Sequence, residues 1–101
     1  MFVILWEYEV KLACEESFQR VYGPHGSRAQ LFRRDPRYLS TQLLRDPFRS
    51  SFYLTLDFWE SETAYDEFLI NNKSSYEALD RATDGLTDAE RLIGRYSQSF
   101  P

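Results

Sequence analysis

Residues 51–69 read SFYLTLDFWESETAYDEFL, and the pattern of this stretch changes part-way along it. Its first half alternates strictly between two kinds of side chain. Because successive side chains of a strand point to opposite faces, the alternation predicts a strand that ends at Trp59. One face of that strand is apolar and the other is amphipathic. The apolar face carries Phe52, Leu54, Leu56 and Phe58. The amphipathic face carries Tyr53, Thr55, Asp57 and Trp59.

The second half of the stretch has the features of a helix. Ser61 is a residue type that caps helices by accepting from the free N–H groups of the first turn. Glu62 adds negative charge at the positive end of the helix dipole. Ala64, Phe68 and Leu69 then recur at helical spacing. We therefore predict a helix from Ser61 to about Ile70, directly after the strand.

The chain before this stretch predicts two further strands and a helix. Alternation indicates strands over residues 2–11 and 38–45, with a tight hairpin connection at Asp46-Pro47. A helix is expected from Cys14 to Tyr22. The sequence Gly23-Pro24-His25-Gly26 ends it, because proline cannot continue the helical hydrogen bonds. A short helical turn through residues 29–32 follows.

The chain after this stretch predicts one more helix and one more strand. Ser74 and Glu77 have the spacing of a capping box, so a helix is expected from Ser74 to about residue 82, before Gly85. Thr87 and Glu90 have the same spacing and predict a single turn over residues 87–90. Alternation then indicates a final strand over residues 91–98.

The predicted order is strand, helix, strand, strand, helix, strand. It favours an α+β fold with a ferredoxin-like antiparallel sheet and helices on one face. In this arrangement we expect the face opposite the helices to carry Trp59, Tyr53 and part of the first strand. An exposed aromatic patch of that size marks an interface or a pocket, so a homodimer packed sheet to sheet is expected.

The composition indicates one folded domain over residues 1–101, since 43% of the residues are hydrophobic and 17% are aromatic. The net charge of −4 gives no general attraction for nucleic acid. Arginines gather at positions 28–37, but Asp35 interrupts them, and a solvated loop is the simplest interpretation. The apolar residues 2–6 are too few for a membrane span. A single cysteine, Cys14, favours a reducing compartment, so a cytoplasmic protein without membrane partners is expected.

Nearly the whole chain resembles the antibiotic biosynthesis monooxygenase family. The similar residues are the segment DFWES at 57–61, Ala64-Tyr65 and Phe68 in the next helix, and LTDAE at 86–90 with Ile93-Gly94. The segment 22–33 is also similar to a branch of mostly uncharacterised members. Family members are small proteins that form a dimeric α/β barrel, and this is the assembly that the resemblance implies.

The resemblance also implies a site and a chemistry. In the polyketide-oxidising members, a phenolic substrate lies between sheet and helices and reacts with dioxygen without metal, flavin or haem. Trp59 and Tyr65 match the tryptophan and tyrosine of that pocket and are the expected catalytic residues. The pocket asparagine falls near Thr55, and the pocket arginine falls near Arg81. The haem-degrading branch needs a histidine in the helix where this chain has Leu69, so no cofactor is expected.

Most of the candidate residues have both a functional and a structural interpretation. Trp59 either stacks on an aromatic substrate or seals the strand–helix junction, and Tyr65 either donates to a phenolate or only packs. Asp57 either titrates upward in a pocket or forms a salt bridge with Arg45 or Arg95. The other expected pocket residues are Tyr53, Thr55, Glu7, His25 and Arg81; Glu7 also suits a solvent-facing position, and His25 also suits a simple turn. A single histidine predicts no metal site.

Three functions follow as hypotheses. The first is a cofactor-independent monooxygenase-like enzyme that oxidises a small aromatic or phenolic compound with dioxygen. The second is a non-enzymatic homodimer that binds a small apolar ligand or has a structural role. The third is an isomerase or lyase that uses a carboxylate base, because a fold alone does not fix a function.

Overall fold

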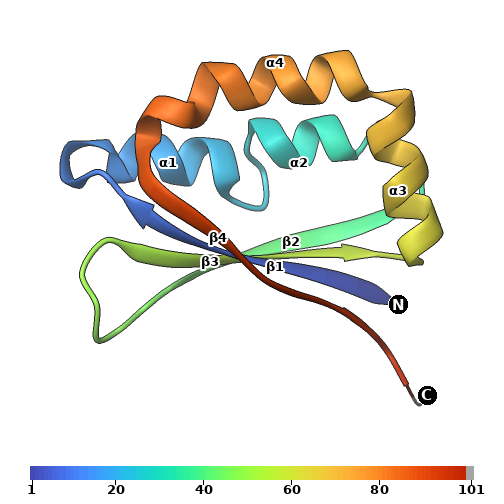
Figure 1. The fold of residues 1–101 in the computed structure, drawn as a ribbon, viewed down its shortest axis with the longest axis horizontal. Coiled ribbons are helices and arrows are strands. Elements are labelled where there is room, and N and C mark those ends of the chain that lie inside the picture. The colour runs from blue at the N-terminus through green and yellow to red at the C-terminus, as the bar shows by residue number, and fades with distance from the viewer. Residues whose placement is uncertain (100–101) are drawn as a thin grey trace.

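The computed structural model describes residues 1–99 and shows a four-stranded antiparallel sheet with its helices on one face (Figure 1). The strand order is β2-β3-β1-β4. The strands are β1 (Phe2–Val10), β2 (Tyr38–Arg45), β3 (Phe52–Trp59) and β4 (Thr87–Ser97). The helices are α1 (Glu15–Tyr22), α2 (Ser27–Phe32), α3 (Glu62–Asn71) and α4 (Lys73–Thr83), with 3-10 turns at Leu12–Cys14 and Asp84–Leu86. The predicted ferredoxin-like fold is confirmed.

The strand-to-helix change in residues 51–69 is also confirmed. Strand β3 pairs with β1 along its whole length, from Phe2 opposite Trp59 to Glu9 opposite Phe52. Helix α3 begins three residues later, and the Ser61 hydroxyl accepts a hydrogen bond from the Ala64 amide at 3.1 Å. This cap ends the strand and fixes where α3 starts. Among residues 1–99, no helix is long and apolar enough to cross a membrane.

The predicted helix from Ser74 to about residue 82 is found, but neither capping pattern predicted near the C-terminus starts a helix. No turn forms over residues 87–90, because Thr87 pairs with Val10 and Glu90 pairs with Tyr8 as the first part of β4. Helix α4 begins at Lys73 without a side-chain cap, so the expected capping box of Ser74 and Glu77 is not the start of the helix. Over residues 87–90, pairing with β1 overrides the local capping pattern.

The sheet face that was predicted to be uncovered is the face that the helices cover. The helices cover the face that carries Tyr53, Thr55, Asp57 and Trp59, and all four residues are buried. Within residues 1–99, no helix covers the opposite face (Figure 1). Strands β1 and β3 place half-buried apolar side chains on it: Val3, Leu5, Leu54, Leu56 and Phe58.

The space between sheet and helices holds two separate hydrophobic clusters. One surrounds Trp59 and Phe68, and the other surrounds Tyr8 and Phe18. Trp6 packs against both clusters. The polar side chains of Arg28, Thr55 and Asp57 are buried beneath the helices as well. Buried polar groups need partners, so the surroundings of these side chains are a place to look for a binding site.

Candidate active site

A cavity of about 220 Å³ lies between the sheet and the helices. Strands β1 and β4 and helices α1, α2 and α4 all contribute to its wall. The lining side chains are Trp6, Tyr8, Tyr22, Arg28, Tyr76, Asp80 and Glu90. Four of these seven side chains are aromatic and one is a buried cation, a combination that suits a small aromatic ligand with one polar group.

Arg28 reaches this cavity because of its place on the short helix α2. Residues 28, 31 and 32 share one helix face, and Leu31 and Phe32 are core residues on that face. Arg28 is therefore drawn inward and is only 8% exposed. Its guanidinium carbon lies 4.9 Å from the ring centre of Tyr22 and 5.1 Å from that of Tyr76. These distances are typical of cation–π contacts, which offset part of the cost of burying the charge.

The expectation that the arginine cluster is only a solvated loop is wrong for Arg28. Its Nη1 donates to Asp80 Oδ1 at 2.7 Å, and its Nη2 donates to the Tyr76 hydroxyl at 2.9 Å. Arg33 and Arg34, on the adjoining segment, are exposed as expected. The sequence interpretation treated the cluster as one unit and missed that a six-residue helix turns one of its members inward.

Asp57 lies on the helix-covered face of β3, and its carboxyl is hydrogen-bonded to Thr41 of β2. The Thr41 hydroxyl donates to Asp57 Oδ1 at 2.6 Å, and the Tyr38 hydroxyl lies 2.7 Å from the Thr41 hydroxyl. Because the one Thr41 proton goes to Asp57, Tyr38 donates to Thr41. The predicted salt bridge to Arg45 or Arg95 is not formed. Arg45 pairs with Glu15, and Arg95 lies near Glu62 and Asp66.

Burial raises the pKa of the Asp57 carboxyl above its usual range, although Thr41 and Arg28 oppose the shift. The folded state then ionises Asp57 less readily than the unfolded state does. The protonated carboxyl of Asp57 therefore stabilises the folded state. This stabilisation is complete at pH values below the pKa of Asp57 in the unfolded state, and it is lost as the pH rises through the pKa of Asp57 in the folded state. We expect Asp57→Asn, which keeps an acceptor for Thr41, to gain stability relative to the native protein as the pH rises from 4 to 7. Urea unfolding at both pH values measures this, and a difference that does not change with pH contradicts it.

Trp59 and Tyr65 lie together, but among other aromatic rings. Trp59 is fully buried, and its ring centre lies 5.5 Å from that of Tyr65 and 5.2 Å from that of Phe68. Within residues 1–99, the indole N–H of Trp59 has no hydrogen-bond partner. Burial raises the pKa of Tyr65, so its hydroxyl stays protonated. Neither residue lines the 220 Å³ cavity.

The remaining candidate residues fall into two groups. Tyr53 and Thr55 are buried beneath the helices, and the Tyr53 hydroxyl donates to Glu15. His25 and Arg81 are exposed, His25 in the loop before α2 and Arg81 in the last turn of α4. The structure therefore places Tyr53, Thr55 and Asp57 together beneath the helices, while His25 and Arg81 lie at the surface.

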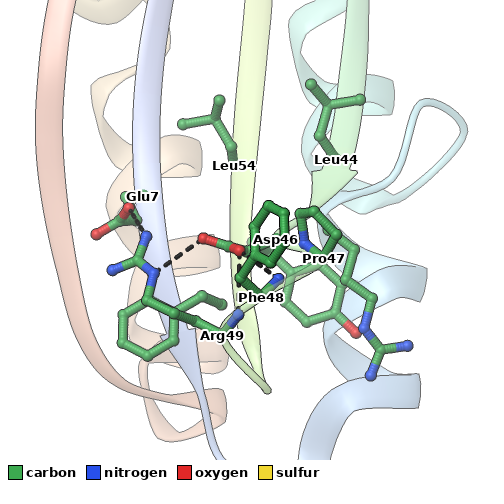
Figure 2. Close-up of a pocket in the computed structure, with 10 residues that line it drawn as sticks. Glu7, Leu44, Asp46, Pro47, Phe48, Arg49 and Leu54 are labelled. Atoms are coloured by element: carbon green, nitrogen blue, oxygen red, sulfur yellow. Dashed lines mark hydrogen bonds and ion pairs between the residues drawn. The ribbon is translucent and has the colours of Figure 1, made fainter.

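Glu7 lies on the uncovered face, beside a surface hollow of about 350 Å³ at the β2–β3 hairpin (Figure 2). Arg49 bridges Glu7 and Asp46, at 2.7 Å and 2.9 Å, and Arg91 also donates to Glu7. These arginines lower the pKa of the Glu7 carboxyl and keep it ionised. The hollow is open at the hairpin tip, where the Phe48 side chain is 94% exposed (Figure 2). It is a groove in a surface rather than an enclosed site.

The sequence interpretation placed none of the seven cavity residues in the site. Besides Arg28, it missed Trp6, Tyr8, Tyr22, Tyr76, Asp80 and Glu90. A signal for two of them was present. Trp6 and Tyr8 alternate on the same strand face as Phe2 and Ile4, so they had to lie under any helices that cover this face. Tyr76 and Glu90 come from α4 and β4, and only the tertiary structure brings them together.

Comparisons with known proteins support the fold. No family model and no curated protein matches the chain. A variant of SnoaB, a cofactor-independent oxygenase from Streptomyces nogalater, superposes with a TM-score of 0.78 at 19% identity, over 99% of this chain and 94% of that one. A candidate antibiotic biosynthesis monooxygenase from Caulobacter crescentus gives a TM-score of 0.79 at 17% identity, over 98% and 90% of the two chains. The chain has the antibiotic biosynthesis monooxygenase fold.

Within this fold, a third structure contains a porphyrin. It is a variant of MhuD with two manganese protoporphyrin IX molecules per active site, with a TM-score of 0.75 at 19% identity, over 100% of this chain and 97% of that one. The residues of this chain do not fit such a group. The single histidine, His25, is in an exposed loop, and a cavity of about 220 Å³ is below the range of about 300–1,000 Å³ for drug-sized ligands.

Proposed function

We propose that this protein is a cofactor-independent oxygenase that oxidises a small phenolic compound with dioxygen in the cavity beneath the helices. One observation carries the proposal: a partly open cavity with mostly aromatic walls and a buried guanidinium, in a fold that SnoaB shares. Aromatic walls bind a planar ring and exclude water. The cation stabilises negative charge on a bound oxygen, and a buried charge acts more strongly than one in bulk water.

The reaction needs only the substrate and dioxygen. A phenol that loses its hydroxyl proton becomes an electron-rich phenolate, which transfers electrons to dioxygen. For a phenol with hydrogen at the carbon opposite its hydroxyl, C₆H₆O and O₂ give the quinone C₆H₄O₂ and H₂O. One oxygen atom enters the ring and the other leaves as water. In this scheme Arg28 holds the phenolate oxygen, and Trp6 and Tyr8 pack against the ring.

Oxygen uptake tests the proposal. A panel of single-ring phenols is incubated with the protein in an oxygen electrode, after dialysis against a chelator to remove stray metal. We expect uptake that depends on the protein, survives the chelator and equals the quinone formed. Heat-denatured protein gives the background of spontaneous oxidation. Binding of phenols without any uptake above this background favours the alternative, a non-enzymatic ligand-binding protein.

We also propose that two copies pack together through their uncovered sheet faces. The apolar residues Leu5, Leu56 and Phe58 lie side by side on this face, and only a second layer would bury them fully. An apolar patch on a sheet usually marks an interface, and two-fold dimers are the commonest assembly.

A charge in this patch is expected to separate the copies. Leu56→Arg places a cation in the centre of the patch, and we expect a dimer of the native chain to become a monomer at micromolar concentration. Leu12→Arg is the matched control, because Leu12 is 79% exposed on the 3-10 turn after β1. Sedimentation equilibrium measures both variants. A native chain that is already monomeric, or a Leu56→Arg variant that stays dimeric, contradicts this assembly.

A further inference from the structure

The solvent-exposed side chains in the wall of the 220 Å³ cavity are both carboxylates. They are Asp80 on α4 and Glu90 on β4, whereas the other side chains of the wall are buried or half-buried. Strand β4 is the edge strand beside β1, and Glu90 pairs with Tyr8. Directly paired residues of an antiparallel sheet share a face, so Glu90 lies where the helix-covered face meets solvent. Asp80 and Glu90 therefore mark the mouth of the cavity.

The two carboxylates of the mouth differ in their partners. Asp80 Oδ1 accepts from Arg28 at 2.7 Å, so these two charges neutralise each other. Within residues 1–99, the Glu90 carboxylate has no ion-pair partner, and the adjacent Arg91 pairs with Glu7 on the uncovered face instead. The wall thus holds one positive and two negative charges, and the negative charge of Glu90 is the one left over.

The charge of Glu90 acts inside the cavity. Burial is the main cause that raises the pKa of the Tyr22 hydroxyl; Glu90 and Asp80 raise it further, and Arg28 opposes them. Tyr22 lines the cavity, so a ligand beside it experiences the same carboxylates. A cleft with an excess of one sign of charge attracts ligands of the opposite sign. A cationic group on a ligand is therefore favoured at the mouth, and an anionic group is disfavoured.

The volume of the cavity limits the rest of the ligand. An engineered cavity of about 150 Å³ in another protein binds benzene. This cavity measures about 220 Å³. The additional space holds about two or three non-hydrogen atoms, at about 30 Å³ for each, the share of one molecule in liquid water. The aromatic side chains of the wall suit a planar ring. One ring with a short chain therefore fills the cavity and reaches the mouth.

We propose that this cavity selects single-ring aromatic compounds with a short cationic side chain, and that Glu90 is the residue that selects them. The inference rests on the ligand cavity of the proposed function and names the charge that its substrate carries. The ring lies among the aromatic side chains, and the ammonium group lies at the mouth beside Glu90. No covalent bond forms or breaks in this step, so binding alone measures it.

Three compounds of matched size test the charge preference: tyramine, tyrosol and 4-hydroxyphenylacetate. Each has a phenol ring with a two-carbon chain, which ends near pH 7 in an ammonium, a hydroxyl and a carboxylate group, respectively. Calorimetric titration in nitrogen-flushed solutions gives their dissociation constants without oxidation. Ion pairs in contact with solvent contribute up to about fivefold to an equilibrium constant. We expect tyramine to bind about two- to fivefold more tightly than tyrosol, and 4-hydroxyphenylacetate to bind most weakly.

Two variants on β4 assign the preference to Glu90. Glu90→Lys reverses the charge at the mouth, and we expect it to bind 4-hydroxyphenylacetate more tightly than tyramine. Asp88→Lys is the matched control, because Asp88 is exposed on the same strand and does not line the cavity. We expect it to retain the native order of affinities. Equal affinities of the native protein for tyramine and tyrosol overturn the proposal, as do an unchanged order in Glu90→Lys and the absence of binding.

The inference and the proposed function fail separately. A preference for tyramine that Glu90→Lys reverses, without oxygen uptake by any phenol, leaves the charge selectivity in place and removes the oxygenase function. Oxygen uptake with equal binding of tyramine and tyrosol removes the role of Glu90 and leaves the oxygenase function.

Discussion

Replacing Trp59 with alanine is expected to lower the free energy of unfolding by about 3–5 kcal/mol, the usual cost of removing a large aromatic side chain from a core. Trp59 is fully buried, and the rings of Phe32, Tyr38 and Phe68 surround it at centre-to-centre distances of 5.5, 5.3 and 5.2 Å. No helix or strand can close the resulting space without moving. Urea unfolding measures the loss.

Two further variants separate packing from catalysis at this position. Trp59→Phe keeps an apolar ring and deletes an indole N–H that has no partner within residues 1–99, so we expect a much smaller loss. Ile70→Ala is the control, since Ile70 is 75% exposed on α3 and its truncation is expected to change stability by less than about 0.5 kcal/mol. A Trp59→Ala variant as stable as the native protein contradicts the packing role. Full stability of Trp59→Phe with loss of phenol oxidation instead favours a role in the reaction.

Replacing Gly26 with alanine is expected to destabilise the protein by about 1–3 kcal/mol or more, because the added carbon collides with backbone. A Cβ at residue 26 lies 2.4 Å from the carbonyl oxygen of Val21 and 2.5 Å from that of Arg20. These carbonyls belong to the last turn of α1, which cannot yield as a flexible side chain does. Gly26 immediately precedes α2, so its displacement also moves Arg28.

Gly85→Ala is the matched control for this substitution. A Cβ at Gly85 meets no atom within 4 Å, so we expect a change of less than about 0.5 kcal/mol. Unfolding in urea gives the stabilities of both variants. Equal stabilities of the two variants contradict the close approach of α1 to Gly26.

The local features of the fold could be predicted because they depend on neighbouring residues. Alternation over residues 52–59 identified β3, and Ser61 identified the start of α3. The covered face could not be identified in this way. Alternation shows which residues share a face, but the more apolar set, with Leu54 and Leu56, is the set left uncovered. The placement of helices depends on how the connections cross the sheet, and this is a property of the whole chain.

The candidate site was predicted less completely than the fold. Asp57 was identified as an inward-facing carboxyl, but its partner Thr41 comes from the neighbouring strand through the register of β2 and β3. Arg28 was taken for a solvated residue as a member of the arginine cluster, although its spacing from Leu31 and Phe32 is that of one helix face. The aromatic rings that make its burial tolerable, Tyr22 and Tyr76, come from two other helices and could not be assigned to it in advance.

The central claim is that small phenols bind beneath the helices and not on the uncovered face. NMR titration of isotope-labelled protein with 4-nitrophenol tests it most directly. We predict that the Arg28 side-chain N–H signal and the ring signals of Tyr8 and Tyr22 shift, while the methyl signals of Leu54 and Leu56 stay in place. Shifts confined to Leu54 and Leu56, with an unchanged Arg28 signal, would place binding on the uncovered face and contradict the site described.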